Sequence, residues 1–391
     1  MKNLCKGIAL AVLLIAVAVP GSAYFEDIGR DARARGMANA MIGIFGNVNS
    51  VQYNPAGTAR STSLELNLQW GKPLTMGDLN DGSSFDAMNG TFLMPFTNDV
   101  NLSWLIRWLF MGLTLGNEEF MFKDGAMALA FDMRDNAQLV KETMITLNYA
   151  KVLDDVLFKG AKLAAGFNID MYSLSFTKTA DWGTLPDNPN DSVFTIGIDL
   201  GVIYNFSENI RLAVVFENLL KPNFSVFDGG EDYSPTNVKL GGSIFFPKLI
   251  FFENMTVTFN YVTYGKYDSS DNTATKASYH FGFESWWFDN IFAFRGGLQL
   301  GDEDMSELSL GISAVLPMGE HLVSFDYAFT LPFGVEGTRH LLALTWKWDL
   351  PKYVFEYDPK KAAEMKRLHE LEQQRLADEE NKKNQTTATN K

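Results

Sequence analysis

Apolar and polar side chains alternate along most of the chain, in successive runs of about 9 to 15 residues bounded by Gly, Pro, Asn, Asp or Ser. In 193–206 every second residue from Phe194 to Phe206 is Phe, Ile, Leu, Val or Tyr, and Thr195, Gly197 and Asp199 lie between them. A period of two is typical of a β-strand with one apolar face. The chain is therefore predicted to be all-β.

Strand length and loop length favour a membrane barrel over a soluble sandwich. Strands of about 9–11 residues cross a bilayer when tilted, whereas globular strands average about 5–6 residues. The strands follow one another without helices, as in an up-and-down barrel. Short connections alternate with long ones, which matches the periplasmic turns and external loops of outer-membrane barrels. The short connections are 207–209, 289–290 and 318–320, and the long ones are 177–191, 220–236, 266–276 and 301–306.

The strand count must be even, because both ends of such a barrel lie in the periplasm. The predicted barrel covers 62–349 and has about 14 antiparallel strands. They are 62–72, 87–96, 126–134, 142–151, 162–176, 193–206, 210–219, 237–247, 255–265, 277–287, 291–300, 307–316, 321–330 and 338–348. The apolar segment 101–115 would be a fifteenth. We interpret 97–125 as a periplasmic insertion lying in the membrane interface, and an extra hairpin giving 16 strands is the alternative.

Composition agrees with a two-faced strand. Hydrophobic residues make up 46% of the chain, yet its mean hydropathy is −0.07. A lipid-facing apolar half and a lumenal polar half explain both values. Trp286, Trp287, Trp346 and Trp348 come at strand ends, where aromatic girdles are expected. The net charge of −14 argues against nucleic acid as a partner.

The first 23 residues have the pattern of a secretory signal peptide. Lys2 and Lys6 precede the apolar run 7–19, and small residues follow Pro20. An N-terminal membrane anchor is the alternative, but the run is short for a bilayer span. The only cysteine, Cys5, would be removed with residues 1–23. The predicted location is the outer membrane, with its lipid as the surrounding solvent.

Residues 24–61 precede the first strand and are rich in small residues. They contain Arg35-Gly36-Met37-Ala38-Asn39-Ala40 and Asn54-Pro55-Ala56-Gly57. This arrangement, together with the strand order and the closing segment 331–348, resembles the FadL-type outer-membrane barrels and, more closely, their PorV/PorQ branch. The resemblance implies that 24–61 folds inside the lumen as a hatch; a disordered leader is the alternative. The residues of this hatch motif are Gly36, Met37, Ala40, Asn54, Pro55, Ala56 and Gly57.

The alternation places charged residues of both signs on the inward face of the predicted strands. The candidate lumenal charges are Asp170, Asp199, Arg211, Glu217, Lys239, Glu284, Arg295, Asp326 and Arg339. We expect a salt-bridged lumen that holds the hatch, and a selectivity lining is the alternative. No G-x-S-x-G motif, metal-ligand spacing or cofactor motif occurs. The sequence therefore predicts no catalytic, metal or cofactor site and no enzyme.

The chain continues past the last strand as a charged tail, 350–391. Residues 359–383 have helical composition and begin at a proline. We expect a periplasmic helix that is either solvated or a docking site for a protein partner.

Two functions fit the sequence. The FadL resemblance implies a gated passive conduit for hydrophobic small molecules. The alternative is a PorV-like secretion or surface-assembly component that binds protein partners.

Overall fold

The structure is a computed structural model that describes residues 30–75, 85–96, 124–136, 140–156, 159–176, 191–227, 229–250, 252–264, 276–301, 306–319, 321–333 and 337–348. All of them belong to a compact unit that ends at Tyr353. The predicted signal peptide, residues 97–123 of the predicted insertion and the tail 350–391 lie outside the described residues.

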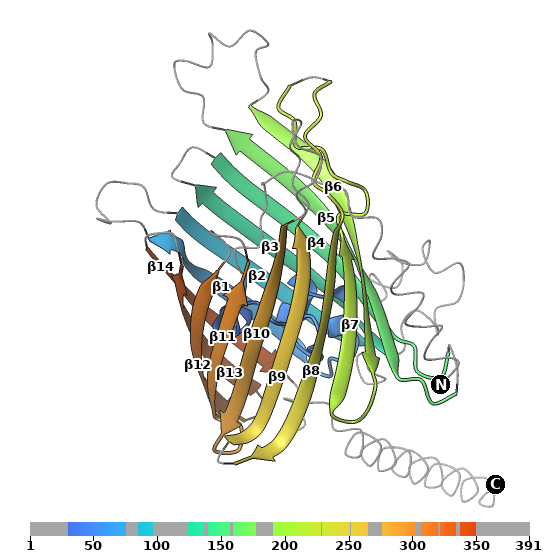
Figure 1. Cartoon of the computed structure of the whole chain (residues 1–391), viewed down its shortest axis with the longest axis vertical. Helices are drawn as coiled ribbons and strands as arrows, with labels where there is room; N and C mark the ends of the chain where they lie inside the picture. Colours follow the sequence, from blue (N-terminus) through green and yellow to red (C-terminus); the bar gives the residue numbers. More distant parts are fainter. Residues whose placement is uncertain are drawn as a thin grey trace, which may run out of the picture. The chain divides into compact units, whose positions relative to one another are not determined.

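Fourteen antiparallel strands form a closed barrel in which each strand pairs with its neighbours in sequence and β1 pairs with β14 (Figure 1). The strands are β1 (Leu64–Thr75), β2 (Phe85–Phe96), β3 (Gly125–Asn136), β4 (Val140–Val152), β5 (Leu163–Phe176), β6 (Ser192–Asn205), β7 (Ile210–Glu217), β8 (Asn237–Leu249), β9 (Phe252–Tyr264), β10 (Lys276–Trp287), β11 (Phe292–Leu300), β12 (Glu307–Met318), β13 (His321–Pro332) and β14 (Thr338–Trp348). The predicted all-β barrel is confirmed.

The junction between β2 and β3 decides the strand number. Phe96 at the end of β2 lies opposite Gly125 at the start of β3, so these two strands are direct neighbours in the wall. No further hairpin fits between them in the closed ring, and the count is 14 rather than 16.

The alternation of the sequence becomes the two faces of the wall. Outward residues such as Leu129, Leu200 and Phe294 are exposed, as lipid-facing side chains must be, whereas inward Asn168 and Ser309 are buried. Closure pairs every strand with two neighbours, which satisfies most of the backbone groups that an open sheet would leave unpaired in lipid.

The expected aromatic girdle needs one correction. Trp346 stacks on Trp348 with ring centroids 4.8 Å apart at the strand end. Trp286, however, is only 5% exposed and lies beneath the Arg295 guanidinium. It has the same parity as Glu284 on β10 and therefore points inward with that residue.

The residues before β1 lie against the inner wall and contain three short helices, α2 (Ala32–Gly36), η2 (Val48–Gln52) and η3 (Pro55–Thr58). Helix α2 contacts β11 to β14, and η3 contacts β3 to β6. Figure 1 shows this part of the chain, in blue, inside the ring of strands. We call residues 30–63 the N-terminal segment. Most of its side chains are buried.

Strand β7 is much shorter than its neighbours. It has 8 residues, whereas β6 has 14 and β8 has 13. The sequence predicted a strand to residue 219, but Asn218 has a φ of 56° and ends it. The β6–β7 pairing consequently stops at Leu200, and β6 continues beyond β7 (Figure 1).

Candidate functional site

The N-terminal segment begins with a capped turn buried in the lumen. The Asp31 carboxylate accepts hydrogen bonds from the backbone N–H groups of Arg33 (3.1 Å) and Ala34 (2.9 Å) and from Asn49 Nδ2 (2.7 Å). These bonds fix the start of helix α2, since an Asp cap satisfies donors that a helix leaves open. Burial raises the pKa of Asp31 to about 6, against the opposing effect of the Ala34 N–H.

Helix α2 directs two arginines at the wall. Arg33 makes a bidentate pair with Glu284 of β10, Nε to Oε2 at 2.8 Å and Nη2 to Oε1 at 2.5 Å. Arg35 Nη2 lies 2.6 Å from Glu307 of β12 and its Nε donates to Thr330 of β13. The Arg35 side chain is 1% exposed, so its charge is compensated within the protein and not by water.

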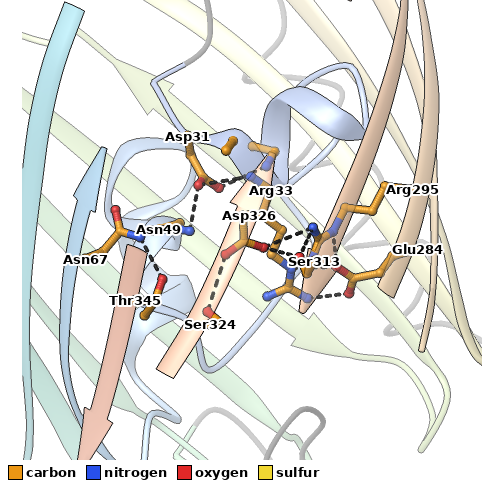
Figure 2. Close-up of polar contacts among 12 residues, drawn as sticks. Asp31, Arg33, Asn49, Asn67, Glu284, Arg295, Ser313, Ser324, Asp326 and Thr345 are labelled. Carbon is orange, nitrogen blue, oxygen red and sulfur yellow. Dashed lines mark hydrogen bonds and ion pairs between the residues drawn. The ribbon is translucent and has the colours of Figure 1, made fainter. Parts of the chain in front are cut away.

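Glu284 is shared between the N-terminal segment and the wall (Figure 2). Arg295 of β11 donates from Nε to Glu284 Oε2 at 2.5 Å, and its Nη1 lies 3.0 Å from Asp326 of β13. Ser313 donates to the same Asp326 carboxylate. The result is a chain of alternating charges running from α2 through β10 and β11 to β13.

Inward side chains of β8 and β9 form hydrogen bonds with the backbone of residues 39–43, in the middle of the N-terminal segment. Ser243 of β8 and Thr258 of β9 donate to the carbonyl oxygens of Gly43 (2.8 Å) and Ala40 (2.6 Å). Asn260 of β9 donates from Nδ2 to the carbonyl oxygen of Asn39 (3.0 Å). These contacts satisfy backbone oxygens that would otherwise be buried without partners.

The end of the segment is held on the opposite wall. Thr58 donates to Asn148 Oδ1 of β4 at 2.7 Å, and Asn148 Nδ2 donates to the Pro55 carbonyl oxygen at 3.1 Å. Arg60 forms an ion pair with Asp154 at 2.5 Å. The segment is therefore attached across the whole lumen.

Wall glycines let the backbone of the segment approach closely. A Cβ on Gly282 would come within 2.7 Å of the Met37 carbonyl oxygen, and one on Gly297 would overlap the backbone of Met37 and Ala38. Gly36 of α2 meets Gly311 of β12 in the same way. Only glycine leaves room for backbone-to-backbone contact at these positions.

The predicted motif residues all belong to this buried packing. Gly36, Met37, Ala40, Asn54, Pro55, Ala56 and Gly57 are buried. Asn54 caps η3 through the Ala56 N–H (3.0 Å) and donates from Nδ2 to the Ile42 carbonyl oxygen (2.8 Å).

The predicted lumenal charges fall into three groups. Glu284, Arg295 and Asp326 form the network above, and Arg339 Nη1 joins Glu307 at 2.9 Å. Arg211 stacks on the Phe45 ring of the N-terminal segment, 5.7 Å from its centroid. The remaining four lie on β5 to β8: Asp170 accepts from Thr146, Asp199 accepts from the Asn218 N–H, and Glu217 pairs with Lys239.

Arg33 and Arg35 of helix α2, and Glu307, the partner of Arg35, were not among the residues predicted from the sequence. Alternation does place Glu307 on the polar face of β12. Two arginines in a small-residue segment that precedes a barrel are a signal for pairing with inward acids, but the spacing alone does not say which ones.

The described residues bear on two further features, a membrane-spanning helix and a metal site. None of their helices combines the length and apolar character needed to cross a bilayer. Within the same residues, no group of three or more His, Cys, Asp or Glu side chains is arranged to hold a metal ion.

The comparisons with known proteins give a family and a fold. A family model described as "Type IX secretion system membrane protein PorP/SprF" matches residues 125–334, more than half of the chain. The match is to PorP/SprF and not to the PorV/PorQ branch that the sequence motifs indicated. Those motifs, at 35–40 and 54–57, lie outside the matched residues. A search of curated proteins found no match.

Two solved structures share the fold. The CymD monoaromatic hydrocarbon channel has a TM-score of 0.53 at 13% identity, covering 83% of this chain and 99% of that one. The toluene transporter TbuX of Ralstonia pickettii has a TM-score of 0.51 at 12% identity, covering 84% and 100%. Identities this low show a FadL-like 14-stranded barrel and nothing about ligands.

Proposed function

Because this chain belongs to the PorP/SprF family of type IX secretion system membrane proteins, we propose that it is a closed outer-membrane component that binds protein partners during secretion or surface assembly. It is a membrane barrel and not an enzyme. The proposal takes the second of the two functions that fit the sequence.

The attachment of the N-terminal segment supports this proposal most strongly. Arg33 and Arg35 make buried ion pairs with β10 and β12, while Thr58 is bound to β4 on the other side. Breaking one buried pair costs about 3–5 kcal/mol because it strands a charge. We infer that the described part of the predicted hatch 24–61, which is residues 30–61 of the N-terminal segment, keeps the lumen shut, and this suits a protein that acts through its surfaces.

A conduit for hydrophobic small molecules is the competing function. It is favoured by the names of CymD and TbuX, a hydrocarbon channel and a toluene transporter, but the likeness to them extends to the fold alone.

Deleting the gene for this chain in its native host distinguishes between the two functions. We expect the type IX cargo proteins, quantified on the cell surface and in the medium by mass spectrometry, to fall strongly, and wild-type protein to restore them. Uptake of radiolabelled toluene should stay unchanged. A normal set of exported proteins together with reduced toluene uptake would refute the proposal and favour the conduit.

The tail is proposed as a periplasmic docking helix, and residues 1–23 as a cleaved signal peptide. Deleting 359–383 should reduce co-purification of secretion-system proteins from crosslinked cells while leaving the barrel in the outer membrane. Unchanged co-purification would leave the tail as a solvated extension.

A further inference from the structure

Because β7 ends early, one edge of the first half of β6 is left without a neighbouring strand. Residues Ser192–Asp199 of β6 pair with β5 on one side but have no β7 residue opposite them on the other. Successive residues of a strand direct their backbone groups to opposite sides. The Leu219 N–H donates to the Ile198 carbonyl oxygen, so Ile198 faces the β7 side, and Ile196 and Phe194 face it too.

On this side, the backbone N–H and C=O groups of Phe194 and Ile196 form no hydrogen bond with any part of the chain that the structure describes. An unpaired edge is costly in lipid and prone to pairing in water. The edge lies at the end of the barrel at which the connection 218–236 also lies, and long connections of this kind are typical of the external end of outer-membrane barrels (Figure 1).

The chain that could have covered the edge is turned into the lumen instead. Asn218 is held by its N–H to Asp199 (2.9 Å), by its Oδ1 to Tyr172 (3.1 Å) and by its Nδ2 to Ser234 (3.1 Å). Beyond this turn Phe224 is 2% exposed and packs on the inward Tyr172, with ring centroids 5.5 Å apart. Three side-chain bonds and a buried aromatic contact thus keep this loop away from the edge.

The outer face of the same edge is apolar. Phe194 is 67% exposed and Ile196 is 44% exposed. A strand added here would satisfy the free backbone groups and cover both side chains with its own alternate residues.

Charge complementarity selects the flanking residues of such a strand. The described residues of the two connections that adjoin the edge in sequence are 191, 218–227 and 229–236, and they contain three acidic residues (Asp191, Glu231 and Asp232) and one lysine (Lys221). A basic partner is attracted to this surface and an acidic one is repelled.

We propose that the edge Ser192–Ile198 is a docking site at which a protein partner adds an extended β-strand with apolar residues at every second position and Lys or Arg beside them. This inference rests on the proposed function, because it names the surface and the chemistry through which the barrel binds protein.

Binding of a defined peptide to the full chain in lipid nanodiscs tests the edge. The probe is Lys-Val-Thr-Val-Arg-Val-Thr-Val-Lys, and the charge control replaces its three basic residues by Glu. Fluorescence anisotropy should show saturable binding of the basic peptide, weakened from about 50 mM to about 300 mM salt, and none of the acidic one. A carbonyl isotope label should give the infrared shift of a paired strand.

Two variants probe the contact. Ile196→Pro removes a free donor without touching the β5 ladder, and Phe194→Lys places a charge on the edge as natural edge strands do; each should weaken binding about tenfold or more. Phe227→Lys is the matched control, since Phe227 is 43% exposed on the loop 218–236 and off the edge. It should bind within about twofold of wild type, because surface substitutions away from a contact have small effects. Heat-dependent gel mobility checks that every barrel is folded.

Several outcomes overturn the proposal. The first is that the basic peptide does not bind to wild type, and the second is that it binds to Phe194→Lys as tightly as to wild type. The third is a wild-type dimer in native mass spectrometry that Ile196→Pro dissociates, because this result would assign the edge to a second copy of the chain. If removal of the chain abolishes secretion while the peptide does not bind, only the edge is refuted. If removal leaves secretion intact, the proposed function fails whatever the peptide does.

Discussion

Replacing Arg33 by Met tests whether ion pairs hold the N-terminal segment in place. Met keeps the apolar stem but removes the two hydrogen bonds to Glu284, at 2.8 and 2.5 Å. Glu284 is 2% exposed, so water cannot replace them. Arg295 still donates to Glu284 at 2.5 Å, which leaves the carboxylate one partner. The cost should therefore fall at the lower end of the range for a broken buried pair, about 3 kcal/mol.

Hydrogen exchange measures this cost locally. The amide of Arg35, which donates to the Asp31 carbonyl oxygen, reports opening of helix α2. A loss of about 3 kcal/mol raises its exchange rate about a hundredfold if opening is local. Arg60→Met is the matched control, because its partner Asp154 has a side chain 30% exposed and regains water. That variant should lose about 1 kcal/mol or less.

A structural role of the Arg33–Glu284 pair is refuted if the Arg35 amide in Arg33→Met exchanges within about threefold of wild type, or if Arg60→Met has an equal effect. The double variant Arg33→Met/Glu284→Gln should be more stable than Arg33→Met alone, since it no longer buries a carboxylate that has lost a partner. An additive loss in this double variant would also argue against the ion pair.

Three other changes test different contacts. Gly297→Ala should displace the backbone of Met37 and lower the free energy of unfolding by about 2 kcal/mol or more. Gly296→Ala, whose Cβ would meet only the Phe283 ring, should cost less. The conductance in planar bilayers should rise for Gly297→Ala alone. Asn54→Ala should cost about 1–2 kcal/mol by removing a cap, read from urea unfolding; an unchanged midpoint would contradict this. The pKa of Asp31 is raised from 3.8 to about 6, so the folded state takes up a proton between pH 7 and pH 4 before the unfolded state does. Relative to Asp31→Asn, the unfolding free energy of wild type should therefore rise by about 2 kcal/mol over this range, and a constant difference would exclude this effect.

The wall was predictable from sequence because alternation is a local property. It placed Glu284 and Arg295 inward, and both are buried there. It also implied an inward Trp286, yet position near a strand end suggested an interfacial residue instead. Parity was the better guide, since a residue cannot leave its face without breaking the ladder.

The contacts inside the lumen were not predictable in the same way. Which acid Arg33 meets depends on the path of residues 30–63 across the ring and on the stagger between strands. The bond between Arg33 and Glu284 joins residues 251 positions apart. The early end of β7 was not predicted, because its apolar pattern does not indicate the left-handed backbone conformation at Asn218.

The route of the N-terminal segment bears on how the ring closes. Leu64 of β1 meets Trp348 of β14, the pairing with the greatest separation along the chain. Closing so long a loop costs entropy before any contact forms. Helix α2 precedes η2, η3 and β1 in the chain, yet its Ala32 N–H donates to the Gln69 side chain of β1 at 2.7 Å, and the helix also contacts β12, β13 and β14. The segment therefore bridges the seam from within, and its contacts with both the first and the last strands offset part of this entropy cost in the closed barrel.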